Sequence, residues 1–151
     1  MIEYKITTAD DIEILMASRL VMLREVNHLP SDCEFSEELV RASRDYFLNG
    51  DQTTVLALED GDVVGCASIS YMTIMPTFSH VTGKRSHLMN VYTAPERRGK
   101  GIAYKMVSML IEDAWNRGAT EISLDATEMG RPLYAKLGFK ESTECMVLTK
   151  E

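Results

Sequence analysis

The sequence contains few cysteines and few aromatic residues. Its 151 residues include three cysteines, and phenylalanine, tryptophan and tyrosine together make up 7%. The cysteines Cys33, Cys66 and Cys145 lie far apart, unlike the dense, even-numbered set of a disulfide-rich secreted domain. The first eleven residues are acidic and contain no apolar core, which predicts that there is no signal peptide. We therefore expect a cytoplasmic protein with reduced thiols.

Long hydrophobic runs and an excess of basic residues are also absent. No apolar stretch approaches the roughly 20 residues that span a bilayer, which argues against a transmembrane protein. Sixteen lysines and arginines stand against 23 aspartates and glutamates, giving a formal net charge of −7. General binders of nucleic acids or anionic membranes carry the opposite balance. We therefore expect neither nucleic acid nor a membrane as a partner.

Recognisable metal and hydrolase patterns are missing as well. The histidines His28, His80 and His87 and the three cysteines show neither H-E-x-x-H nor C-x-x-C spacing, so we expect no metal. No G-x-S-x-G elbow is present, which argues against a hydrolase of that type. What remains is an ordinary globular composition, 45% apolar and 26% charged, in a length that suits a single domain over 1–151.

Hydrophobic periodicity and turn residues predict the order of the elements. Strands are expected over 2–6, 53–58, 63–72, 86–93, 120–125 and 142–149, and helices over 9–26, 33–48, 101–117 and 129–137. Thr8 and Asp11 have the form of a capping box for the first helix, and Asp60-Gly61 has the form of a tight hairpin turn. A helix joins 86–93 to 120–125, so these two strands should be parallel. The expected fold class is α/β (α+β), a mixed central sheet flanked by about four helices.

One segment carries a chemical signal, the glycine-containing turn at 97–103 that opens the helix with the clearest pattern. Gly99 and Gly101 lack a Cβ, so a ligand can come close to the backbone. The first amides of a helix are unpaired and lie at the positive end of its dipole, which favours an anion. A basic island in this acidic chain favours a phosphate ligand, with a plain helix cap as the alternative. The island consists of Arg97, Arg98 and Lys100.

Two common phosphate-binding motifs do not fit this turn. A P-loop requires G-x-x-x-x-G-K followed by Ser or Thr, which the sequence does not contain. A dinucleotide-binding fold requires G-x-G-x-x-G, and here Tyr104 replaces the third glycine. The acidic residue in the right place would be Asp125, and the 26 residues after it are too few to complete such a sheet.

Two motifs together resemble those of the GNAT N-acetyltransferase superfamily. The run Arg98-Gly99-Lys100-Gly101-Ile102-Ala103 matches the acetyl-CoA motif of that family, Arg/Gln-x-x-Gly-x-Gly/Ala. The run 133–139, Leu-Tyr-Ala-Lys-Leu-Gly-Phe, matches the family's L-Y-x-K-x-G-F ending. Tyr134 follows Arg98 by 36 positions, with a helix, a strand and the start of a second helix between them. The resemblance covers nearly the whole chain and is closest to an uncharacterised bacterial branch.

The resemblance implies acetyl-CoA as cosubstrate, held between strands 86–93 and 120–125 where these splay apart. Backbone groups of Val91 and Thr93 would bind the pantetheine arm, and the amides of 98–103 would hold the pyrophosphate. One departure is Thr127, which stands where many relatives have asparagine. The implied cofactor-binding residues are Val91, Tyr92, Thr93, Arg97, Arg98, Gly99, Lys100, Gly101, Ile102, Ala103, Thr127 and Tyr134.

The resemblance also implies direct transfer of the acetyl group to the primary amine of a small molecule or peptide. Tyr134 would be the general acid for the departing thiolate, and the Val91 amide the oxyanion donor. Glu128 is the candidate general base, from a set that also contains Asp125, Glu25, Glu34, His80 and His87. The alternative is a non-catalytic acyl-CoA sensor. Relatives are often homodimers, and no motif here decides that point.

The long connection before strand 86–93 is a candidate cover for the acceptor. Residues 76–86 are many for a link between strands, and long ordered loops are often functional. We expect this segment, with the one between the first two helices, to lie over the acceptor; a plain surface loop is the alternative.

Overall fold

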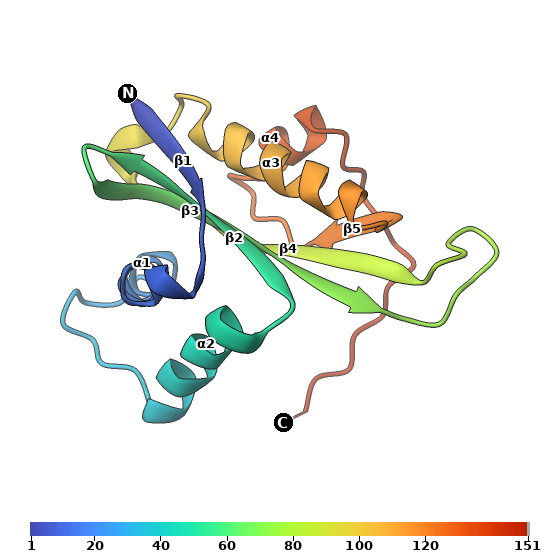
Figure 1. The fold of residues 1–151 in the computed structure, drawn as a ribbon, viewed down its shortest axis with the longest axis horizontal. Helices are drawn as coiled ribbons and strands as arrows, with labels where there is room; N and C mark the ends of the chain where they lie inside the picture. The colour runs from blue at the N-terminus through green and yellow to red at the C-terminus, as the bar shows by residue number, and fades with distance from the viewer. Residues whose placement is uncertain (151) are drawn as a thin grey trace.

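A computed structural model describes residues 1–150, and it contains a sheet between two layers of helices (Figure 1). The strands are β1 (Ile2–Ile6), β2 (Gln52–Glu59), β3 (Asp62–Thr73), β4 (Lys84–Thr93) and β5 (Glu121–Leu124). The helices are α1 (Ile12–Val26), α2 (Glu37–Asn49), α3 (Ile102–Asn116) and α4 (Arg131–Lys136), with the 3-10 turns η1 (Ala9–Asp11) and η2 (Pro95–Arg97). This mixed α/β architecture confirms the expected fold class.

The sheet is mixed, and its one parallel pair opens at one end. The order is β1-β2-β3-β4-β5, antiparallel throughout except for β4 and β5. Asp60 and Gly61, with φ of 52° and 84°, form the predicted tight turn between β2 and β3. The parallel ladder ends at Leu88 and Leu124, whereas β4 continues to Thr93. The two strands therefore part at their carboxyl ends, as the family resemblance implies.

Alternate residues of the central strands face opposite helical layers. One face of the sheet packs against α3, and the other packs against α1 and α2 (Figure 1). The α3 layer buries Val55, Ala67, Ile69, Leu88, Met106 and Leu110, and the α1/α2 layer buries Leu15, Met16, Phe47, Leu56 and Cys66. Within residues 1–150, no helix combines the length and apolar character that a bilayer crossing requires.

The chain after α4 contradicts one prediction. The segment 142–149 is not a strand, and Met146, Val147 and Leu148 are 95%, 82% and 99% exposed. A strand is stable only when a neighbouring edge pairs its backbone and a core covers one side, and this segment has neither. Cys145, which lies within this segment, is accordingly exposed.

Two smaller boundaries also differ from the prediction. Helix α2 begins at Glu37 rather than at 33, because the Ser36 hydroxyl accepts a hydrogen bond from the Leu39 amide and caps it there. Helix α4 spans Arg131–Lys136 rather than 129–137. The capping box of Thr8 and Asp11 is present as predicted.

The connection between β3 and β4 lies at the end of the sheet away from the splay (Figure 1). It comes before Lys84, the first residue of β4, and it packs against the link between α3 and β5. His80 contacts the Thr120 hydroxyl at 2.8 Å, and Thr82 lies 3.5 Å from the Gly118 carbonyl. Our expectation that this segment covers the acceptor side of the splayed strands is therefore wrong.

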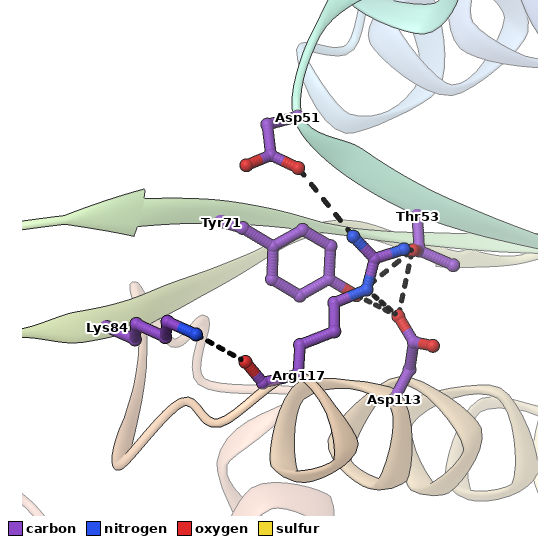
Figure 2. Close-up of polar contacts among 6 residues, drawn as sticks. All are labelled: Asp51, Thr53, Tyr71, Lys84, Asp113 and Arg117. Atoms are coloured by element: carbon purple, nitrogen blue, oxygen red, sulfur yellow. Dashed lines mark hydrogen bonds and ion pairs between the residues drawn. The ribbon is translucent and has the colours of Figure 1, made fainter. Parts of the chain in front are cut away.

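A polar cluster ties the end of α3 to the sheet (Figure 2). The Asp113 carboxylate accepts hydrogen bonds from the hydroxyls of Tyr71 and Thr53 and, at 3.0 Å, from Arg117 Nε. The Arg117 guanidinium also stacks 4.2 Å from the centre of the Tyr71 ring. Burial and the hydrogen bond to Asp113 raise the pKa of Tyr71 to about 12. The phenol therefore stays protonated at neutral pH and acts as a structural donor.

Candidate active site

The turn before α3 borders a cleft of about 550 Å³. Gly99 and Gly101 have φ of 79° and 81°, a region that residues with a Cβ rarely adopt. A Cβ placed on either glycine would meet no atom within 4 Å. A ligand in the cleft can therefore approach this backbone closely, as the sequence predicts for an anion.

Several polar groups at this cleft have no protein partner. Within residues 1–150, the amides of Gly99, Lys100 and Gly101 donate to no backbone or side-chain acceptor, and a helix leaves its own first amides unpaired. The Thr93 hydroxyl lines the cleft and is buried without a hydrogen bond. The Arg98 amide, in contrast, donates to the Pro95 carbonyl at 3.3 Å. The predicted set of free amides therefore begins one residue later, at Gly99.

The two arginines of the turn are anchored by carboxylates from other elements. Arg97 donates through Nε to Glu59 at 2.9 Å. Arg98 donates through Nε to the Thr93 carbonyl at 3.0 Å and through Nη2 to Glu25 at 3.1 Å. Both arginines still line the cleft. They give its mouth positive charge and tie the turn to α1 and to the β2–β3 turn.

Helix α4 forms the opposite side of the cleft. Pro132, Leu133 and Lys136 line it, together with Ile102, Ala103 and Tyr104 of α3. The Tyr134 ring is half-buried and packs edge-on against Phe139, with centroids 5.9 Å apart. Burial raises the pKa of Tyr134, and its hydroxyl has no hydrogen-bond partner within residues 1–150. The phenol is therefore protonated at neutral pH and available as a donor.

The link between β5 and α4 holds two predicted site residues on the surface. The Thr127 hydroxyl accepts a hydrogen bond from the Gly130 amide at 3.1 Å, so it is already used to shape the turn before α4. Glu128 is exposed. Asp125, just after β5, is fully exposed and lies 3.7 Å from the His87 ring.

Strand β4 contains a bulge at the point where β4 and β5 part. The register between β3 and β4 shifts here, and neither Asn90 nor Val91 has a partner in the ladder. Asn90 adopts φ of 59°, so the strand turns locally, as bulges do. Val91 packs on the α3 side, and its amide sits in this unpaired stretch. Tyr92 faces α1, where burial and its hydrogen bond to Glu25 raise the pKa of its phenol.

A second cavity, of about 200 Å³, lies on the α1/α2 face of the sheet beside the bulge. The Arg19 guanidinium enters it from α1 and donates to the Asn90 side chain at 2.8 Å. The other lining residues are Ala42, Ser43, Tyr46, Phe47, Ser68 and Met89. The splayed end of β4 thus separates a cleft on one side from a smaller cavity on the other.

The candidate bases lie in different places. Glu25 is bound by Tyr92 and Arg98, and Glu34 is exposed between α1 and α2. His80 lies at the far end of the sheet. His87 pairs with Ser70 in register and contacts Ser123 at 2.7 Å. The Ser70 hydroxyl is hydrogen-bonded to Tyr46 of α2, so Ser70 points to the α1/α2 face of the sheet. Directly paired residues on neighbouring strands point to the same face, so His87 lies on the face that carries the second cavity.

Sequence reasoning missed the residues of this second cavity. Arg19 is the clearest case, because it sits three and four residues from the buried Met16 and Leu15 on α1. A charged residue on the apolar stripe of a helix is an available signal. Asn90 carried no such signal, because a bulge depends on the register of two strands.

Comparisons with known proteins agree with this geometry. The family model described as the acetyltransferase (GNAT) family matches residues 20–139. A glucosamine 6-phosphate N-acetyltransferase of Trypanosoma brucei brucei is 32% identical over 80 residues, 53% of this chain and 52% of that enzyme, so the match spans about half of it. A thialysine N-epsilon-acetyltransferase of Sus scrofa is 29% identical over 129 residues, 81% of this chain and 75% of that enzyme.

A solved structure resembles the whole chain. It is a crystal structure of a "predicted acetyltransferase with acetyl-CoA" from Clostridium acetobutylicum, with a TM-score of 0.85 and 30% identity. The likeness covers 99% of this chain and 96% of that one. The overall fold of this chain is thus shared with that structure.

Proposed function

The chain belongs to the acetyltransferase (GNAT) family, and from that premise we propose that it is an acetyl-CoA-dependent N-acetyltransferase. It moves the acetyl group directly to the primary amine of a small molecule or peptide. The observation that carries this proposal is the cleft at the start of α3. Unpaired amides, two glycines at positive φ and two arginines meet there, and this is chemistry suited to a pyrophosphate.

The residues around the cleft fit the rest of the cosubstrate. The amides of Gly99 to Ala103 and the side chains of Arg97, Arg98 and Lys100 would hold the pyrophosphate. The orphaned Thr93 hydroxyl and the backbone of the bulge would hold the amides of the pantetheine arm. A ligand that satisfies these groups removes the cost of leaving them unpaired.

In the proposed reaction, the amine nitrogen attacks the thioester carbonyl carbon, and the C–S bond then breaks. The Val91 amide stabilises the negative charge that develops on the carbonyl oxygen. Tyr134 gives its proton to the departing thiolate, a role for which a protonated phenol is suited. The base takes the proton that the amine loses.

Two side chains are the proposed bases. Glu128 is the first, because it lies on the link between the splayed β5 and Tyr134. His87 is the second, because it shares the face of the cavity beside the bulge and its ring contacts Ser123 and Asp125. Glu128→Gln and His87→Gln distinguish them, since the base is the residue whose removal abolishes the acid limb of the kcat/KM pH profile.

The acceptor is proposed to be a small molecule. The two enzymes compared above are named for glucosamine 6-phosphate and for thialysine, both small amines. The cavity beside the bulge, about 200 Å³, suits a side chain or a small metabolite.

A thiol-release assay with acetyl-CoA and a panel of primary amines tests the proposed function. Release of CoA that depends on an amine, with mass spectrometry of the acetylated product, supports an enzyme. Binding of acetyl-CoA in calorimetry without release for any amine would instead support the non-catalytic sensor. Absence of acetyl-CoA binding would overturn both.

A further inference from the structure

Arg19 is a half-buried cation without a carboxylate partner. Six other arginines, Arg44, Arg85, Arg97, Arg98, Arg117 and Arg131, each lie within 4.0 Å of a carboxylate. The Arg19 guanidinium contacts only neutral atoms within residues 1–150, the Asn90 side-chain oxygen and the Met22 sulfur. Burial lowers the pKa of Arg19, but an arginine remains charged at pH 7. A cation in such surroundings is costly unless an anion pairs with it.

The cavity that Arg19 enters has the chemistry of a small-molecule site. Ala42, Phe47 and Met89 supply apolar walls, and the hydroxyls of Ser43 and Tyr46 lie among them. Apolar walls with a few polar groups and one charge are typical of sites for small ligands. The guanidinium presents planar, paired donors that match a carboxylate or phosphate.

The position of the cavity relates it to the proposed reaction. Met89 and Asn90 line it, and the next residue is Val91, the proposed oxyanion donor. The cavity lies on the α1/α2 face, whereas the cleft at the α3 turn is bordered by α3 and α4. A molecule in the cavity therefore reaches the splay from the side opposite the cosubstrate.

We propose that this cavity is the acceptor subsite and that Arg19 binds an anionic group, a carboxylate or phosphate, carried by the amine substrate. This inference rests on the proposed function and narrows its substrate class. The acceptor has a primary amine at one end and an anion at the other. The negative net charge of the protein would favour the diffusional encounter with cationic acceptors. Among these acceptors, Arg19 selects those that also carry an anionic group.

Matched substrate pairs test this inference. Lysine and cadaverine differ by one carboxylate, and glucosamine 6-phosphate and glucosamine differ by one phosphate. Because hydrogen bonds between charged groups are the stronger class, the wild type should favour the anionic member of at least one pair by about 10- to 100-fold in kcat/KM. The pair that shows the preference identifies the anion. Arg19→Gln should bring the kcat/KM of the anionic and the neutral member to within about threefold of each other. Arg19→Lys should keep part of the preference.

Calorimetry provides a readout that does not depend on turnover. Lysine and glucosamine 6-phosphate are titrated into the protein with and without CoA, and Arg19→Gln should weaken the binding of the tighter probe by about 10-fold or more. Arg41→Gln is the matched control, because it removes the same charge from the exposed face of α2. Failure of acetyl-CoA binding or of all thiol release refutes the proposed function, whereas these titrations still report on Arg19.

Three results would overturn the subsite. The first is an equal kcat/KM for the anionic and the neutral member in both pairs. The second is that neither lysine nor glucosamine 6-phosphate binds in calorimetry. The third is that Arg19→Gln lowers kcat/KM equally for the anionic and the neutral members. The last result would mean that Arg19 stabilises the bulge at Asn90 rather than binding substrate, because the loss of a structural role affects every acceptor equally.

Discussion

The Arg98 guanidinium lies 3.1 Å from the Glu25 carboxylate, across 73 positions of sequence. The second carboxylate oxygen of Glu25 accepts a hydrogen bond from the Tyr92 hydroxyl. A carboxylate with both oxygens engaged is a poor proton acceptor for a substrate amine. Glu25 therefore joins the end of α1 to the α3 turn and to β4, and we propose that it is a positioning residue rather than a base.

The role of Glu25 predicts a mild phenotype. In Glu25→Gln, the acid limb of the kcat/KM pH profile should persist with its midpoint unchanged, because the base lies elsewhere. The free energy of unfolding should fall by about 1 kcal/mol or less, since partly exposed ion pairs contribute little. Rate profiles and urea titrations measure both. A 100-fold loss of kcat with the acid limb removed would return Glu25 to the candidate bases.

The α3 turn predicts a selective loss of cosubstrate binding. Gly101→Glu places a side chain and a negative charge in open space at the turn, so calorimetry should detect no acetyl-CoA binding. Gly61→Glu is the matched control, because Gly61 also has positive φ and a Cβ placed there would likewise meet no atom within 4 Å. It carries similar backbone strain, of about 1–2 kcal/mol, in the β2–β3 turn, whose Gly61 does not line the cleft. Unchanged affinity in a folded Gly101 variant would refute the assignment of this turn.

The proposed acid predicts a loss of chemistry without a loss of binding. Tyr134→Phe keeps the ring that packs on Phe139 and removes the hydroxyl, so kcat should fall by about 10²- to 10⁴-fold. Acetyl-CoA affinity should stay within a few-fold. Tyr4→Phe, on β1, serves as the control. A kcat within about threefold of the wild type, with chemistry rate-limiting, would show that another group protonates the thiolate.

The cluster around Asp113 predicts how stability depends on pH. Burial raises the pKa of Asp113, but hydrogen bonds from Tyr71 and Thr53 and the charge of Arg117 outweigh burial, so the net pKa lies below 3.8. The folded state therefore favours the ionised carboxylate. Its stabilising contribution is complete above the unfolded pKa and is lost as pH falls through the folded pKa.

Asp113→Asn should accordingly lower the free energy of unfolding at pH 7, by roughly 1–3 kcal/mol. The difference from the wild type should shrink as the pH falls below about 4. Urea unfolding at several pH values measures it, with Asp62→Asn on the exposed start of β3 as control. A difference that stays constant down to pH 2 would mean that ionisation of Asp113 does not stabilise the fold.

The sequence by itself determined the features that depend on neighbouring residues. The Asp60-Gly61 turn, the Thr8 capping box and the glycines before α3 are encoded within a few positions, because each reflects the backbone preferences of its own residues. The parallel pairing of β4 and β5 also followed, since a helical connection between two strands allows one arrangement. Two short motifs in order were enough to indicate the family.

The tertiary structure alone decided which distant groups meet. Arg19 reaches Asn90 across 71 positions, and Glu25 reaches Arg98, because α1 packs against the same end of β4 from which the α3 turn departs. The connection between β3 and β4 lies away from the splay because β4 runs from that connection toward it. The segment 142–149 has strand-forming residues but pairs with no strand of the sheet. Such contacts depend on the packing of whole layers, and no local pattern in the chain records them.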